Sequence, residues 1–166
     1  MLEQEVDRVT GGRPVESAHI ERLVLVQQVL KESMRLYPPV PLLSRQTVVA
    51  TRLDGIDLLP GATVVMPIYA MHRHVQRWED PDAFDPGRFA PEREAKISRY
   101  QYLPFGAGPR ICIGMAFAMI EATAMLATLV QKVRFAPVAG RDPYPVARVT
   151  LHPGGGLPLH VHLRGL

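Results

Sequence analysis

The residue of this chain best suited to chemistry is its single cysteine, Cys112, in the loop Phe105-Gly-Ala-Gly-Pro-Arg-Ile-Cys-Ile-Gly114. The apolar segment that follows, Met115 to Val130, predicts a helix. A thiol just before a helix N-terminus lies at the positive end of the helix dipole, among N–H groups without intrahelical acceptors. These surroundings favour the thiolate, the form of cysteine that binds metal. Gly114 has no side chain, which leaves room for a flat, bulky group against the backbone.

The spacing of the loop bears on two interpretations of Cys112. A lone cysteine after a Gly/Pro turn can be a buried structural residue. However, Phe105, Gly108, Arg110, Cys112 and Gly114 fill every fixed position of the pattern FxxGxRxCxG, so the loop resembles the haem-binding loop of the cytochrome P450 family. The resemblance implies that Cys112 is the axial thiolate that binds the iron of haem b. It also implies that Arg110 neutralises a haem propionate, that Phe105 packs near the sulfur, and that Gly108 and Gly114 belong to the cofactor site.

A second motif is the pair Glu32 and Arg35, which share one face of a predicted helix. Such a pair could be an exposed ion pair worth roughly 0.3–0.5 kcal/mol. Because Leu36-Tyr-Pro-Pro39 follows it, the segment resembles the ExxR helix of the same family, in which the pair is buried. A buried pair needs further partners. The resemblance supplies Arg88, from Pro86-Gly-Arg-Phe89, although the acidic residue of the family pattern PERF is replaced here by Gly87.

Two other segments invite a functional interpretation. The resemblance places Val40, Leu42 and Leu43 on the substrate side of the haem and Arg45 at a propionate, whereas Arg45 could also be a surface residue of an edge strand. The pair His72 and His74 could bind a metal, but further ligands at suitable spacing are missing, so a structural role is the better interpretation.

The elements that must position these residues can be predicted from pattern and turn signals. We expect helices over 2–9 and from an N-cap at Ser17 to Leu36, where Pro38 and Pro39 end the helix. Strands are expected over 47–52 and 58–66, with turns at Asp54-Gly55 and Pro60-Gly61. A short helix over 67–71, a core position for Trp78 and an exposed loop over 90–99 follow. The apolar segment 115–130 should be a buried helix, and 146–151 and 157–163 should form a terminal hairpin with a glycine-rich tip.

Composition limits the class of protein. A net charge of +3 without a basic run interleaved with aromatic residues makes nucleic-acid binding an unfavourable hypothesis. One cysteine excludes a disulfide within the chain. The apolar segment 115–130 is short for a membrane span and contains Glu121, so a membrane is not indicated. The N-terminus is acidic and polar rather than a signal peptide, and a cytoplasmic location is expected.

These observations predict one segment, residues 1–166, of α+β class within the mainly α cytochrome P450 fold. It would be the C-terminal, haem-proximal part, with the ExxR helix, a small β-sheet, a meander, the cysteine loop, a buried helix and a terminal β-hairpin. The resemblance implies a monooxygenase that inserts one oxygen atom from O2 into a small organic substrate. Its electrons would come from a redox partner of the ferredoxin or flavoprotein reductase type.

The same resemblance also limits the function. The distal helix with its acid–alcohol pair is missing, so no catalytic residue beyond the haem ligand can be identified. The isolated chain is therefore expected to be inactive. The alternative function is a truncated, non-catalytic remnant that binds haem weakly or not at all.

Overall fold

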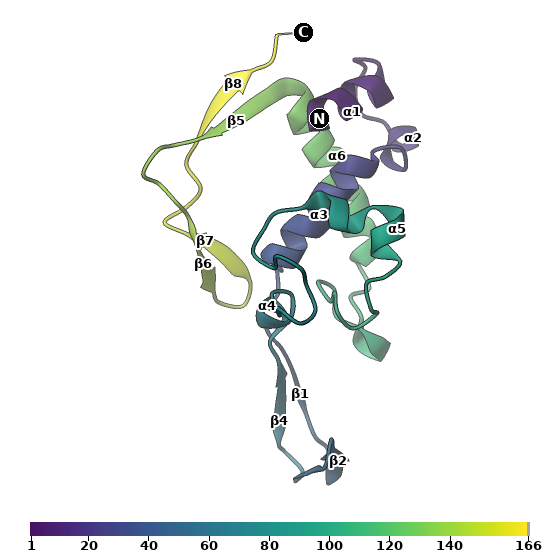
Figure 1. Ribbon diagram of the computed structural model, residues 1–166, viewed down its shortest axis with the longest axis vertical. Helices are drawn as coiled ribbons and strands as arrows, with labels where there is room; N and C mark the ends of the chain where they lie inside the picture. Colours follow the sequence, from purple (N-terminus) through teal and green to yellow (C-terminus); the bar gives the residue numbers. More distant parts are fainter. Residues whose placement is uncertain (166) are drawn as a thin grey trace.

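Most helices of the chain lie together on one side, while its strands form small ladders to the left of them and below them (Figure 1). The computed structural model describes residues 1–165. The α-helices are α1 (Leu2–Thr10), α2 (Ser17–Ile20), α3 (Val24–Leu36), α4 (Ile68–Met71), α5 (Pro91–Glu94) and α6 (Met115–Lys132), and the 3-10 helices are η1 (Pro86–Phe89) and η2 (Gly108–Arg110). The strands are β1 (Leu43–Gln46), β2 (Thr51–Leu53), β3 (Ile56–Leu58), β4 (Thr63–Met66), β5 (Val133–Pro137), β6 (Tyr144–Ala147), β7 (Leu151–Gly154) and β8 (Leu159–Leu163).

The apolar core lies where α1, α3 and α6 pack together. Its buried side chains are Val6, Val9, Leu23, Val26, Ala127 and Val130. Beside it, the buried Gln131 amide donates hydrogen bonds to the Thr10 hydroxyl and the Arg13 carbonyl, at 2.9 Å each. This satisfied polar contact fixes the end of α6 against α1, because a buried amide without partners would be costly.

The predicted helix from Ser17 to Leu36 is wrong in one respect, because the structure divides it into α2 and α3. Glu16, rather than Ser17, is the N-cap of α2, and it forms a reciprocal capping box with His19. Leu23 lies between α2 and α3 and is completely buried, so its side chain packs into the core at the point where the helix is interrupted. The end of the helix is confirmed, since Tyr37 is the C-cap of α3.

The small sheets are antiparallel two-stranded ladders, and their pairing corrects the predicted strands. β1 pairs with β4, and β2 pairs with β3 across the predicted Asp54-Gly55 turn. The predicted terminal hairpin is wrong: β6 pairs with β7 around residues 148–150, whereas β8 pairs with β5. The glycines after β7 therefore form a connection between ladders and not a hairpin tip. The predicted loop over 90–99 also contains the short helix α5.

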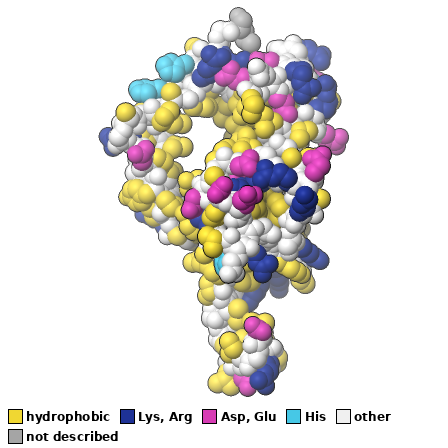
Figure 2. Space-filling model, viewed as in Figure 1, with side chains coloured by type: hydrophobic (Ala, Val, Ile, Leu, Met, Phe, Trp, Pro, Cys, Tyr) yellow, Lys and Arg dark blue, Asp and Glu magenta, His cyan; other side chains and the backbone are white. Residues whose placement is uncertain are grey.

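The helix α6 is not buried all round, contrary to the apolar pattern of its sequence. Thr123, Ala127, Val130 and Gln131 face the core, whereas Phe117 remains 70% exposed. Figure 2 shows an opening between the helices and the arm of C-terminal strands, bordered largely by hydrophobic side chains. The α+β class is confirmed. However, α6 has more apolar side chains than the described residues bury.

Candidate functional site

The cysteine loop is a short, hydrogen-bonded turn that presents an exposed thiol. The N–H of Cys112 donates to the Phe105 carbonyl at 2.9 Å, which closes the loop around η2. Gly106 and Gly108 have φ values of +72° and +73°, a region that residues with a side chain rarely adopt. Gly114 is the N-cap of α6, so the exposed sulfur lies just before a long helix. In the described residues, Cys112 is therefore not a buried structural cysteine.

The space beside the sulfur is bordered by backbone and apolar side chains. A Cβ at Gly114 would lie 3.9 Å from the Cys112 sulfur, which is van der Waals contact. Because glycine has no Cβ, this space beside the sulfur stays open. Ile113, between the two residues, is fully exposed, and Ile111 is 46% exposed. An accessible sulfur donor, a glycine gap and exposed apolar side chains together suit a flat, apolar ligand with a thiophilic metal.

Glu32 and Arg35 are both completely buried near the end of α3. The Arg35 Nε and one of its terminal nitrogens donate to the two Glu32 oxygens at 2.7 and 2.9 Å. The remaining donors reach the carbonyl oxygens of His72, Pro81 and Ala83, at 2.9, 2.6 and 3.0 Å. The guanidinium also stacks over Trp78 at 5.1 Å. A charge buried this deeply is tolerated because its partners surround it.

Arg88 is the further partner of Glu32. Its Nε lies 3.3 Å from Glu32 Oε1, and its terminal nitrogen donates to the Asp80 carbonyl at 2.7 Å. The backbone N–H of Asp85 also donates to Oε1, at 2.8 Å. The structure thus brings Glu32, Arg35 and Arg88 together and ties the irregular segment 80–88 to α3.

Asp85 provides local anchoring where Gly87 departs from the family pattern. Its carboxylate accepts the Gly87 N–H at 2.9 Å and the Arg93 guanidinium at 2.8 Å. A Cβ at Gly87 would lie 3.0 Å from the Asp85 carboxylate, so the pair occupies the space beside the glycine. Burial acts to raise the pKa of Asp85, but the hydrogen bond and charge of Arg93 outweigh it and hold this pKa below its usual value.

His72 is completely buried and joins α3 to the segment before the cysteine loop. Its Nε2 lies 2.8 Å from the Leu103 backbone nitrogen, and its Nδ1 lies 3.2 Å from the Arg35 carbonyl oxygen. Because a backbone N–H can only donate, Nε2 accepts, and the ring proton is on Nδ1. Burial, together with the charges of Arg35 and Arg73, lowers the pKa of His72 to about 4.

The metal alternative for His72 and His74 does not fit this geometry. Both nitrogens of His72 have backbone partners, and Nδ1 of His74 accepts the Gln76 N–H at 3.2 Å. Within residues 1–165, no group of three or more metal-binding side chains is found. The structural interpretation of the histidines is therefore the one the contacts favour.

The two arginines assigned to propionates are both exposed at the surface. Arg45 donates to the Ser44 carbonyl at 2.7 Å, and in residues 1–165 neither Arg45 nor Arg110 pairs with a carboxylate. Arg45 lies on β1, in register with Val64. Both guanidinium groups are therefore open to an external anion, and Arg can bind a carboxylate through paired hydrogen bonds.

Leu43 is brought against the cysteine loop, whereas Val40 and Leu42 face outward. The Leu43 side chain would lie 3.5 Å from a Cβ at Gly106. Val40 and Leu42 are 36% and 54% exposed. Phe105 is half-buried, so the loop and the start of β1 form one partly apolar surface.

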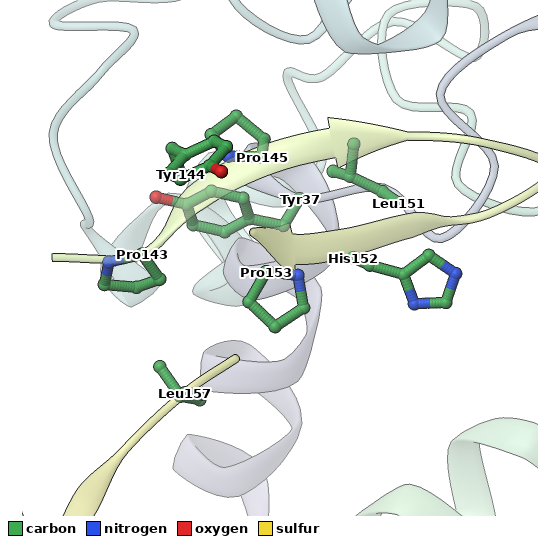
Figure 3. A pocket seen from close by; sticks show the side chains of 8 residues that line it. All are labelled: Tyr37, Pro143, Tyr144, Pro145, Leu151, His152, Pro153 and Leu157. Carbon is green, nitrogen blue, oxygen red and sulfur yellow. The ribbon is translucent and has the colours of Figure 1, made fainter. Parts of the chain in front are cut away.

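An apolar cavity of about 280 Å³ lies between the end of α3 and the β6–β7 hairpin. Tyr37 and Tyr144 turn their rings into it, whereas the His152 ring points away (Figure 3). The Leu151 N–H donates to the Pro39 carbonyl at 2.9 Å, which holds the hairpin beside the exit from α3. A neighbouring cavity is lined by Leu42 and shares Pro145 and Leu151. The hairpin and the segment after α3 therefore present a continuous apolar surface.

The role of Gly106 and the contact made by His72 were missed from the sequence. Gly106 is not a fixed position of the loop pattern, yet its positive φ is needed for the turn before η2. In the sequence, only its place directly after Phe105 could have indicated this role. A structural role was predicted for His72, but its contact with Leu103 joins elements that are distant in sequence, so no local spacing reveals this contact.

The fold and the cysteine loop together define the class of protein. The family model for cytochrome P450 matches residues 1–157, and the chain belongs to this family. A crystal structure of the cytochrome P450DA haem domain superposes on 99% of this chain and 36% of that chain, with a TM-score of 0.90 and 29% identity. The predicted fold is therefore confirmed.

Curated relatives cover nearly the whole chain. Cyclooctatin synthase of Streptomyces melanosporofaciens is 41% identical over 92% of this chain and 33% of that protein. Pentalenene oxygenase of Streptomyces avermitilis is 35% identical over 91% and 34%, and cytochrome P450 4A10 of Mus musculus is 35% identical over 95% and 31%. The chain thus spans about a third of the length of these relatives. In the part that the structure describes, no helix has the length and apolar character needed to cross a membrane.

Proposed function

We propose that the chain forms the thiolate-ligand side of a haem monooxygenase, an oxidoreductase that inserts one oxygen atom from O2 into an organic substrate. The observation that carries this proposal is the exposed Cys112 sulfur, which lies just before α6 in a loop that follows Leu103. Leu103 is linked through His72 to the backbone of the buried Arg35. Membership of the cytochrome P450 family supports haem b as the cofactor.

The residues of the site would hold haem in distinct ways. Cys112 would bind the haem iron through its sulfur, and a thiolate ligand would supply the electron density that oxygen activation by haem requires. Arg45 and Arg110 would bind the propionates, since both lack carboxylate partners in residues 1–165. Phe105 would pack near the sulfur, and Gly108 and Gly114 would keep the loop close to the ring plane.

The substrate and electron donor follow from the same proposal. Val40, Leu42 and Leu43 would face a small organic substrate, and the apolar cavities at the β6–β7 hairpin support an apolar one. The relative named pentalenene oxygenase supports an oxygenation reaction. The electrons would come from a redox partner of the ferredoxin or flavoprotein reductase type.

The second candidate function is a non-catalytic remnant that binds haem weakly or not at all. The exposed apolar face of α6 favours it, because Phe117, Ile120 and Met125 are 70%, 54% and 59% exposed. A cofactor held on one side only would also be more accessible to water, which weakens binding. The chain spans about a third of the length of its relatives, and this length is compatible with both candidate functions.

The test is the carbon monoxide difference spectrum of the reduced, haem-loaded chain, which reports thiolate ligation. We expect the thiolate signature in the wild type and in Val149→Ser, an exposed change outside the loop. Cys112→Ser should lose it, because a hydroxyl replaces the sulfur donor. A signature retained by Cys112→Ser would disprove Cys112 as the ligand. A wild type that binds no haem would favour the remnant.

A further inference from the structure

The contacts of His72 continue past Leu103 into the cysteine loop. Leu103 donates its N–H to His72 Nε2, and its carbonyl accepts the Gly106 N–H at 3.1 Å. Within that turn, Phe105 offers its carbonyl to the Cys112 N–H at 2.9 Å. A series of hydrogen bonds therefore runs from the Arg35 carbonyl, through the imidazole, to the backbone of Cys112.

His72 is also held at its own backbone, which makes the ring a defined point of attachment. Arg35 donates a hydrogen bond to the His72 carbonyl at 2.9 Å, while the His72 ring contacts the Arg35 carbonyl. The neighbouring Arg73 side chain donates to the Leu36 carbonyl. These contacts attach residues 72 and 73 to the last turn of α3, where carbonyls lack intrahelical partners.

Aromatic neighbours fix the orientation of the ring. His72 stacks on Tyr102 with 5.3 Å between ring centroids and meets Trp78 edge-on at 6.5 Å. The Tyr102 hydroxyl donates to the Lys31 carbonyl at 2.9 Å, so the stacking partner is itself attached to α3. With the ring plane fixed, Nε2 points at one backbone N–H and at the start of one turn.

We propose that His72 is a positioning residue that holds the cysteine loop on the buried end of α3 and thereby sets the position of Cys112. The proposal rests on the proposed function for the role of Cys112, but the attachment itself is a property of this chain. His72 does not touch the cofactor site. It acts through the Leu103 N–H and the turn that Leu103 begins.

The test compares two amide variants that separate the two ring contacts. In His72→Gln, the longer side chain can place an oxygen near Nε2 and still accept from Leu103. In His72→Asn, the shorter side chain can donate to the Arg35 carbonyl but cannot reach Leu103. We expect the Leu103 and Cys112 amides of the cofactor-free chain to exchange with solvent about tenfold faster in His72→Asn than in the wild type, as for loss of one hydrogen bond. In His72→Gln, both rates should stay within about threefold of the wild type.

The second readout is the carbon monoxide difference spectrum of the haem-loaded variants. His72→Asn should lose part of the thiolate signature, and His72→Gln should retain it. The Val26 N–H, which donates to Glu5 at 3.0 Å near the other end of α3, monitors the fold as a whole.

The outcomes distinguish this proposal from the proposed function. If the Val26 amide is accelerated as much as the Leu103 amide, or if His72→Gln behaves like His72→Asn, the ring supports the fold in general and the proposal is wrong. If the wild type binds no haem, the proposed function fails, while the exchange rates of Leu103 and Cys112 still decide the role of His72.

Discussion

The imidazole of His72 combines full burial with two backbone partners, and this makes its protonation costly. A protonated ring would turn Nε2 into a donor facing the Leu103 N–H, which is also a donor. The charged and titratable groups around it are Arg35 on α3, the adjacent Arg73, and Tyr102, whose pKa is raised by burial. The nearest charges are thus positive, and they add to the effect of burial.

This arrangement predicts a loss of stability in mild acid. The unfolded chain binds the His72 proton below about pH 6.5, whereas the folded chain binds it only near pH 4. The free energy of unfolding should therefore rise with pH across this window and fall by about 3 kcal/mol on acidification through it. Denaturant unfolding of the wild type and His72→Gln at pH 7 and pH 4 measures the difference. An equal pH dependence in both would show that His72 does not contribute.

Cys112 differs from His72 because its surroundings are open. Its sulfur is exposed, Gly114 leaves space beside it, and Gly108 has a positive φ, so this loop does not use the sulfur for internal packing. The two residues have different roles in our proposals: Cys112 binds the cofactor, and His72 holds the backbone of the loop that contains Cys112.

The helix α3 carries two kinds of ion pair. Arg35 and Glu32 are completely buried, whereas the pair of Lys31 with Glu94 has side chains that are 27% and 39% exposed. Burial makes the first pair costly to break, because the remaining carboxylate would be left poorly compensated in a low-dielectric environment. Water screens the second pair, so little should be lost with it.

We expect Arg35→Ala to lower the free energy of unfolding by about 3–5 kcal/mol. It would also leave the carbonyls of His72, Pro81 and Ala83 without this donor. Lys31→Ala is the matched control on the same helix and should cost less than about 1 kcal/mol. Denaturant unfolding of both variants is the measurement. Equal costs would contradict a structural role for the buried pair.

The helix α6 contributes one face to the core and leaves another uncovered. Its inward side packs on α1 and α3 through Ala127 and Val130, while Phe117 and Ile120 share an outward side, three residues apart. The elements around the site are therefore well anchored on the α3 side and open on the outer side of α6.

The chain as a whole exposes many large hydrophobic side chains. Exposed large hydrophobic side chains occur on α6, on the C-terminal strands and on the β1–β4 arm, which projects away from the opening seen in Figure 2. Contiguous exposed apolar patches are typical of interaction sites or of association.

This surface predicts strong binding of a hydrophobic dye by the isolated chain. Phe117→Glu combined with Ile120→Glu should lower anilinonaphthalene sulfonate fluorescence by about twofold, because both charges fall on the exposed face of α6. The matched control combines Val48→Glu with Val149→Glu, which are 88% and 90% exposed but lie apart from α6. A similar loss of fluorescence in the control would show that the dye does not prefer the α6 face.

Local sequence patterns were sufficient for the ends of α1 and α3 and for the α+β class. Pro38 and Pro39 end α3, and Gly11 ends α1 in the left-handed conformation, since both effects are local to the backbone. Strand pairing was harder. The hairpin around the glycines was wrong because β8 finds its partner in β5, and non-local pairing leaves no signal in a single sequence.

The sequence by itself determined which residues we propose for the site: residue type and spacing select Cys112 and the fixed glycines and arginine of its loop, and the family resemblance predicted that Glu32 and Arg35 are buried. Only the tertiary structure decided how these parts are connected. The His72 contact with Leu103, the Asp85 anchoring beside Gly87 and the open face of α6 each join or separate elements that are distant in the chain. Spacing can describe one helix or one loop, but such contacts depend on how separate elements pack against each other.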